Sequence, residues 1–203
     1  TKCIGTDASS SVWFKNLSTT ANGSVTLTAT WSTNDYEITI DSAIQHGTVT
    51  YEEVPSNSLF ETTIQITAVP DTGYQLKADS IKVYKTGDPA TEVPVTNNRF
   101  TVPAFGVTIT AEFEPKEYNI TYNLDGGTAG TSQPTPGTYD AVFEVSAPTK
   151  EGHTFTGWTV AGTDPDYTTA KYGKSSDSVE TAITANTKCI GTDASSSVWF
   201  KNL

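Results

Sequence analysis

The first seventeen residues of the chain, TKCIGTDASSSVWFKNL, recur without change at residues 187–203. The offset between the two copies is 187 − 1 = 186 residues. Repeats of solenoid proteins are about 20–50 residues long and cannot fold singly. A unit of 186 residues is long enough for one or two domains of about 100–150 residues. The repetition therefore predicts a tandem array, of which the chain holds one unit and the first seventeen residues of the next.

Apolar and polar residues alternate along much of the chain, as they do in strands with one buried face. Residues rich in Gly, Pro and Asp separate the alternating runs and are typical of turns. No segment carries an apolar helical stripe over three turns; DSVETAI (177–183) and SSSVWFKNL are predicted as single turns or short strands. The pattern predicts an all-β or β-rich fold, with strands in SVTLTATWS (24–32), YEITID (36–41), TIQITAV (63–69), SIKVYK (80–85), GVTITAEFE (106–114) and EYNITYNL (117–124).

The charge balance excludes some partners. The chain has 23 acidic and 12 basic residues and a net charge of −11, which argues against binding nucleic acid or an anionic membrane surface. It contains no apolar run of about 18 residues, so no membrane insertion is expected. No signal segment is recognisable, and we expect an export signal and a cell-wall anchor to lie outside the segment.

Residues with catalytic or ligand-binding chemistry do not cluster. His46 and His153 occupy turns without a Cys, His or carboxylate cluster, and no hydrolase or phosphate-binding motif occurs. Asp164 and Asp166 in TDPDY are compatible with a Ca²⁺ turn, but a solvated turn is favoured. A sugar-binding platform of Trp13, Trp31 and Trp158 is disfavoured against a place in the core. We therefore predict no catalytic residue, no metal and no cofactor, and a protein that is not an enzyme.

Cys3 and Cys189 occupy the same repeat position, so each unit has one cysteine and cannot form an internal disulfide. A buried thiol is favoured over a disulfide between units or between chains. Three Asn residues head glycosylation sequons: Asn16, Asn22 and Asn119. Asn22-Gly23 is equally compatible with a tight turn, and Asn119 with polar spacing on a sheet surface.

Two stretches resemble a known family. YNITYNLDGGT (118–128) followed by APTKEGHTFTGW (147–158) resembles the Listeria–Bacteroides repeat, the B repeat of internalin-type surface proteins. The closing strand of that pattern is VTLTATW (25–31). His153 stands where the family usually has Tyr, and a long insertion follows Trp158. Residues 36–114 resemble the divergent relative of this repeat through PDTGY (70–74) and PAFGVTITA (103–111).

The resemblance implies small β-grasp-like domains in an exported, extracellular or cell-surface prokaryotic protein. Residues 1–33 would then be the C-terminal part of one B-repeat-like domain, with its closing strand at 25–31. Residues 36–114 would form a divergent domain, and residues 118–203 a B-repeat-like domain that lacks its closing strand. We expect two such domains per unit, arranged as an elongated rod.

These expectations lead to two functional interpretations. In the first, the chain is a structural unit of an extracellular filament or stalk and its partners are further copies of itself. Val25, Leu27, Ala29 and Trp31 of one unit would then complete the domain of the next, because residues 32–35 reach only about 14 Å and cannot return across a domain roughly 30 Å wide. In the second, the chain is an adhesin module whose loops bind a host protein or glycan.

Overall fold

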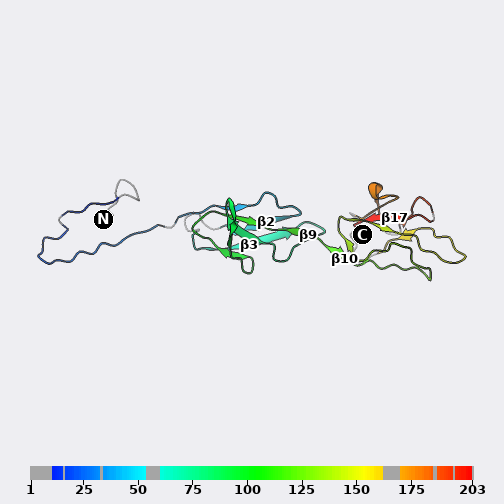
Figure 1. Ribbon diagram of the computed structural model, residues 1–203, viewed down its shortest axis with the longest axis horizontal. Helices are drawn as coiled ribbons and strands as arrows, with labels where there is room; N and C mark the ends of the chain where they lie inside the picture. The colour runs from blue at the N-terminus through cyan, green and yellow to red at the C-terminus, as the bar shows by residue number, and fades with distance from the viewer. Residues whose placement is uncertain are drawn as a thin grey trace. The chain divides into compact units, whose positions relative to one another are not determined.

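The computed structural model describes residues 11–15, 17–32, 34–53, 60–161, 170–184, 187–193 and 195–202. The chain divides into two compact units, residues 1–33 and residues 34–203. We call residues 11–32 the N-terminal segment. The second unit holds two separate hydrophobic cores, and we name its parts after them: the central region (34–116) and the C-terminal region (117–202). The described residues contain strands and one 3-10 turn, which confirms the predicted β-rich class (Figure 1).

The central region consists of three small sheets, with strand orders β1-β8-β5-β6, β2-β3-β7 and β4-β9. Alternate residues of its strands, among them Ile64, Ile66 and Val83, are at most 1 % exposed and form one core. The strands are β1 (Ile38–Ile40), β2 (Gly47–Tyr51), β3 (Thr63–Pro70), β4 (Tyr74–Leu76), β5 (Lys82–Lys85), β6 (Asp88–Val93), β7 (Arg99–Thr101), β8 (Val107–Thr110) and β9 (Phe113–Pro115).

The first and last strands of the four-stranded sheet, β1 and β8, pair in parallel. Ile38 lies opposite Val107, and Ile40 lies opposite Ile109. On its other side, β8 pairs antiparallel with β5. The closing strand β8 therefore occupies the middle of the sheet, and Val107 and Ile109 are fully buried. This pairing closes the core of the central region.

The described residues of the C-terminal region form three small sheets, with strand orders β12-β17-β14-β15, β10-β11 and β13-β16. An isolated bridge joins Thr128 to Thr149. Its core contains Val145, Ile183, Val198 and Phe200. The elements are β10 (Glu117–Tyr118), β11 (Gly137–Thr138), β12 (Val142–Val145), β13 (Trp158–Thr159), β14 (Lys171–Gly173), η2 (Ser176–Ser178), β15 (Thr181–Ala182), β16 (Lys188–Cys189) and β17 (Val198–Lys201).

Two predicted strands are wrong as assigned. Residues 25–31 form no strand, and the predicted strand 117–124 is reduced to β10 at its first two residues. Both segments keep the alternating sequence, but a strand also needs a hydrogen-bonded neighbour. Among the described residues, 25–31 has none, and 117–124 has one only at β10, which pairs with β11. The short candidate at 177–183 becomes the turn η2 and the strand β15, and the second copy of SVWFK contributes β17.

Candidate strand-docking site

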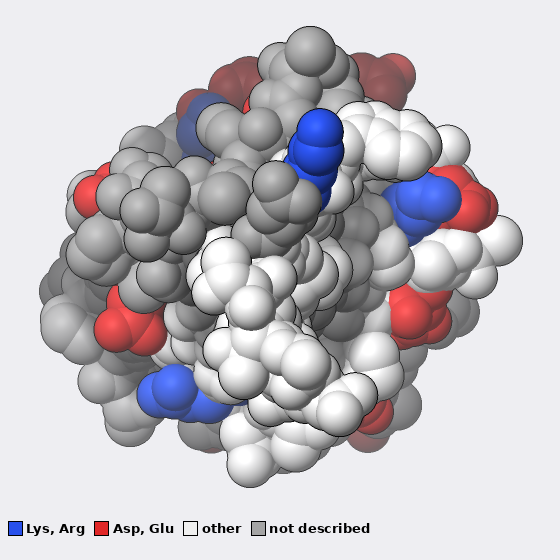
Figure 2. Space-filling model, turned by 90° about the vertical axis from the view of Figure 1, so that its left-hand side faces the viewer, with Lys and Arg blue, Asp and Glu red and all other residues white. Residues whose placement is uncertain are grey.

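The N-terminal segment exposes its apolar side chains. Every described residue from Trp13 to Ser32 is exposed; Leu27 is 63 % exposed and Trp31 is 92 % exposed. Lys15 is the single charged residue among the described residues of this segment. On the face drawn in Figure 2, most of the coloured surface is white, the colour of uncharged residues. Apolar side chains in this state are typical of a surface that binds a partner.

The repeated sequence occurs in two different environments. In its second copy, Val198 and Phe200 belong to β17, which pairs with β12 and β14, and Phe200 is 2 % exposed. In the first copy, the equivalent Phe14 is 44 % exposed and lies in no strand. One sequence is therefore buried where its sheet neighbours are present and exposed where they are not.

The segment 119–124 of the C-terminal region lies in no strand and has no strand neighbour among the described residues. Ile120, Tyr122 and Leu124 are half-buried, while Asn119 and Thr121 between them are exposed. This alternation is that of a strand with one buried face. The Tyr122 hydroxyl donates a hydrogen bond to the Pro134 carbonyl oxygen at 2.8 Å, and burial raises the pKa of Tyr122. The inward face is thus in place, and the Ile120 N–H donates to Thr135 Oγ1 at 3.4 Å, but no strand pairs with this segment in the described part of the chain.

The central region contains the same two sequence patterns in a paired state. Its β1 sequence YEITI matches YNITY at 118–122, and its VTITAEF at 107–113 matches VTLTATW at 25–31. By analogy, the parallel register of β1 and β8 predicts Ile120 opposite Val25, and Tyr122 opposite Leu27. In the paired state Val107 and Ile109 are 0 % exposed.

The turns at Gly73 and Gly152 provide a second correspondence between the central and C-terminal regions. Gly73 and Gly152 both have positive φ, 83° and 70°, and the residue after each donates its N–H to a carbonyl oxygen three residues before it at 3.0 Å. In the central region, β4 after this turn pairs with β9, and Leu76 lies opposite Phe113. In the C-terminal region the equivalent of Leu76 is Phe155, which has no such opposite residue and lines a cavity of about 440 Å³.

Three aromatic side chains of the C-terminal region meet beside this cavity. The Trp158 ring packs edge-on against Tyr122, with ring centroids 5.8 Å apart, and against Phe155, with centroids 5.3 Å apart. The Trp158 Nε1 atom is buried and has no hydrogen-bond partner among the described residues. A buried indole N–H usually has an acceptor, and the described residues supply none for Trp158 Nε1.

The central and C-terminal regions touch through a polar and aromatic contact that sequence reasoning missed. Tyr74 stacks on His46 at a centroid distance of 4.1 Å and packs edge-on against Tyr139 at 5.5 Å. Its hydroxyl donates to Asp140 Oδ2 at 3.3 Å, and Lys201 Nζ lies 2.6 Å from Asp140 Oδ1. The hydrogen bond from Lys201, supported by those from Tyr74 and Asn202, lowers the pKa of Asp140 against the opposing effect of burial.

Comparison with known proteins agrees with these correspondences. Residues 36–117 match the family described as the divergent InlB B-repeat domain, and residues 118–188 match the Listeria-Bacteroides repeat domain. The two matched segments are B-repeat domains. We call the central region the first B-repeat domain and the C-terminal region the second. A stretch of 74 residues is 40 % identical to Internalin H of Listeria monocytogenes serovar 1/2a (strain ATCC BAA-679 / EGD-e), covering 34 % of this chain and 13 % of that protein. No solved structure matches the chain.

The chain therefore spans about an eighth of the length of this internalin relative. Tandem B-repeat domains and the internalin similarity are features of a cell-surface repeat protein, and neither family is one of enzymes. Within the described residues, no helix has the length and apolar character needed to cross a membrane.

The remaining predicted site residues lie apart from the docking site or outside the described residues. Cys189 is fully buried opposite Trp158 in the second B-repeat domain, and burial raises the pKa of its thiol to about 11. Asn22 is exposed at φ 58° in a turn, and Asn119 is exposed on the outer face of the unpaired segment. Glycosylation and a disulfide between units stay predictions. The residues outside the described part are Cys3, Asn16, Asp164 and Asp166.

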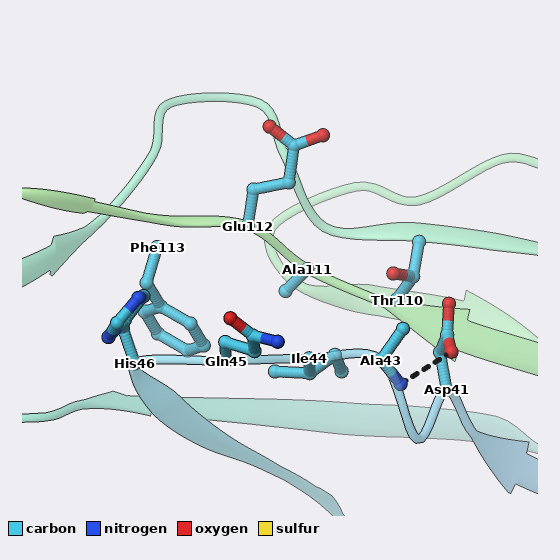
Figure 3. A pocket seen from close by; sticks show the side chains of 9 residues that line it. All are labelled: Asp41, Ala43, Ile44, Gln45, His46, Thr110, Ala111, Glu112 and Phe113. Atoms are coloured by element: carbon cyan, nitrogen blue, oxygen red, sulfur yellow. Dashed lines mark hydrogen bonds between the residues drawn. The ribbon is translucent and has the colours of Figure 1, made fainter.

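The first B-repeat domain has a cavity of about 370 Å³, and both carboxylates that line it already have partners (Figure 3). Asp41 accepts a hydrogen bond from the Ala43 N–H at 2.9 Å. Glu112 points away from the other lining side chains and pairs with Lys77 at 2.5 Å, and His46 stacks on Tyr74. No group of three metal-ligating side chains occurs among the described residues. These contacts explain the positions of Asp41, Glu112 and His46 without a ligand in the cavity.

Proposed function

We propose that the chain is a structural unit of an extracellular tandem array, in which the closing strand of each second B-repeat domain is supplied by the next unit. The strand is the repeat of Val25–Trp31. The observation that carries this proposal is the contrast between the two domains. The first pairs its opening and closing strands in parallel, while in the second the matching opening segment 119–124 has no strand neighbour among the described residues.

The direction of the chain argues against the N-terminal segment closing the C-terminal region of the same chain. Parallel strands begin at the same end of a sheet, so a chain that enters at β1 leaves the central region beyond the opposite end of β8. If the N-terminal segment closed the C-terminal region of the same chain, Trp31 would lie at the far end of the central region, where the chain leaves it. Residues 32–35 would then have to lead back from there to the start of β1. Four residues reach at most about 14 Å, and one domain of this size is about 30 Å across.

Energetics favours a donor strand that continues the same polypeptide. Burying three apolar side chains contributes about 1.5–3 kcal/mol each. Association of separate molecules costs roughly 4–15 kcal/mol in lost translational and rotational freedom, which cancels much of that gain. In a tandem array the position after Leu203 is that of Ser18, so the strand arrives on a short tether with an effective concentration in the millimolar range. Separate molecules are therefore expected to associate weakly.

The test uses the side-chain pair that marks the register. In the first B-repeat domain the Thr39 and Thr108 hydroxyls lie 3.0 Å apart across β1 and β8. The equivalent pair is Thr121 and Thr26. Two variants of the full chain, Thr26→Cys and Thr121→Cys, both with Cys3→Ser, are mixed at high concentration under mild oxidation and separated by non-reducing electrophoresis.

A heterodimer is expected from this pair at least about tenfold faster than from the matched control, Thr28→Cys with Thr121→Cys, whose side chains lie two residues out of register. Equal rates, or no heterodimer, would overturn the proposal. A Thr121→Cys chain extended after Leu203 by a second copy of Ser18–Trp31 supplies its own strand, and is expected to stop reacting with the Thr26→Cys chain. Continued reaction would contradict closure by the continuing polypeptide.

Binding of a host protein or glycan stays a prediction. A pull-down or glycan array with the extended chain separates it from the structural role, because that chain would present its loops with its strands paired.

A further inference from the structure

We infer that Trp31 anchors the docked strand by seating its ring beside Phe155, at the aromatic cluster of Tyr122, Phe155 and Trp158. The ring comes from the next repeat unit, so the inference rests on the proposed function and adds the residue that holds the joint between units. It assigns a binding site to the cavity of about 440 Å³ in the second B-repeat domain.

The position of the ring follows from the first B-repeat domain. Phe113 is the residue equivalent to Trp31, six positions after Val107 as Trp31 is six after Val25. It lies in β9 opposite Leu76 of β4. The Phe113 ring packs so closely over Gly47 that a Cβ added there would lie 2.5 Å from its Cζ atom. An aromatic side chain at this position is therefore the inner cover of a closed domain.

The second B-repeat domain presents the matching receptor. Its turn at Gly152 repeats the turn at Gly73, which places Phe155 where the first domain has Leu76. Phe155 is half-buried and lines the cavity together with Thr149 and Lys150. A strand that enters in the register of β8 would bring position 31 opposite Phe155.

The site also contains a buried donor, Trp158 Nε1, for which a docked strand would supply an acceptor. In the first domain the closing strand lies between β1 and β5. Tyr122 lies on the segment equivalent to β1, and its ring packs against Trp158 of β13 at a centroid distance of 5.8 Å. The closing strand would therefore pass the buried Trp158 Nε1, which has no acceptor among the described residues, and its backbone carbonyl groups are acceptors.

The two exposed tryptophans of the N-terminal segment provide a matched pair for the test. Trp13 and Trp31 are both 92 % exposed, but only Trp31 falls in the closing strand. Each is replaced by Ala in the full-length Thr26→Cys chain, and the rate of disulfide formation with the Thr121→Cys chain is measured. Trp31→Ala is expected to lower that rate by about 30-fold, or roughly 2 kcal/mol at 1.4 kcal/mol per tenfold. Trp13→Ala and Trp31→Phe should change it less than threefold.

The receptor side is tested in the Thr121→Cys chain. Phe155→Ala is expected to lower the rate about tenfold, and Phe155→Leu, which restores the residue type of the first domain, less than threefold. The control is Thr156→Ala, because Thr156 is exposed and does not line the cavity. Far-UV circular dichroism checks that each variant is folded, and if Phe155→Ala is not, the Trp31 variants decide.

The two levels of the proposal fail differently. If the parent pair forms the register-specific disulfide but Trp31→Ala reacts at the parent rate, the anchor is wrong and the strand docking stands. If the parent pair itself shows no preference over the Thr28→Cys control, both are wrong.

Discussion

Ile109 and Leu27 occupy the same position of the closing-strand pattern, yet replacing each by Ala should change the free energy of unfolding by very different amounts. Ile109 is 0 % exposed at the centre of its sheet, with Ile40 and Val83 opposite it on the two neighbouring strands. Leu27 is 63 % exposed and lies in no strand. The comparison isolates the effect of the missing sheet neighbours from the effect of sequence.

The magnitudes follow from the burial. Ile109→Ala removes the transfer free energy of the lost carbon atoms and leaves a cavity between two paired strands that cannot easily collapse, so it should cost about 3 kcal/mol. With an m-value of about 1 kcal/mol/M for a domain of this size, the urea midpoint of the central region falls by roughly 3 M. Leu27→Ala removes an already hydrated side chain and should change the free energy of unfolding by less than about 0.5 kcal/mol.

The assay can follow the two regions separately because all four Trp residues, at 13, 31, 158 and 199, lie outside the central region. Urea unfolding at low micromolar concentration is followed by tryptophan emission and by far-UV circular dichroism. Ile109→Ala should shift the circular dichroism transition and leave the tryptophan transition nearly unchanged, and Leu27→Ala should shift neither.

A loss of more than about 1 kcal/mol in dilute Leu27→Ala would refute the reasoning, since it would mean that Leu27 is already buried in the single chain. At high concentration the same variant should weaken disulfide formation between Thr26→Cys and Thr121→Cys chains, whereas Val69→Ala, which truncates a 57 % exposed side chain in the central region, should not.

Three further predictions concern other contacts. Asp140→Asn keeps a residue that tolerates the positive φ of 65° but weakens the ion pair with Lys201, and should cost at most about 1 kcal/mol at pH 7. Because the pKa of Asp140 is lowered in the folded state, the stability difference between Asp140→Asn and the parent should be complete above about pH 4 and should vanish as the pH falls through that pKa. A difference in urea midpoint that does not depend on pH would contradict this prediction. With Cys3→Ser, Cys189 should react with a thiol reagent at pH 8 only as the C-terminal region unfolds, and immediate labelling would show that the thiol is accessible. Gly73→Ala should destabilise the central region by about 1–2 kcal/mol, through its φ of 83° and contact with the Tyr139 ring, and should shift the ring resonances of Tyr139; unchanged resonances would argue against that contact.

The sequence predicted most of the central region, because its strands have their partners within the same stretch of chain. TIQITAV became β3, and its inward residues Ile64 and Ile66 are buried as the alternation requires. The same reasoning assigned a strand to 25–31, where the structure has none. Alternation specifies which face of a segment is apolar, but it carries no information on whether a neighbouring strand is present.

The joint between the central and C-terminal regions shows a different limit. The Gly, Pro and Asp residues of PDTGY (70–74) and QPTPGTYD (133–140) are typical of turns, but nothing in either stretch indicates that Tyr74 reaches Asp140, 66 residues away. The contact depends on how two folded regions meet. Cys189 is an intermediate case: one cysteine per unit excluded an internal disulfide, and the structure adds that the thiol is buried.

The parallel pairing of β1 and β8 has a mechanical consequence. In an array under tension, the load enters a domain at the start of its opening strand and leaves at the end of its closing strand. These two strands are hydrogen-bonded neighbours that run in the same direction. Pulling on the ends therefore slides one strand along the other, so the ladder bonds carry the force together and do not open one by one. The joint that would link one repeat to the next would then also be the element that bears tension along the array.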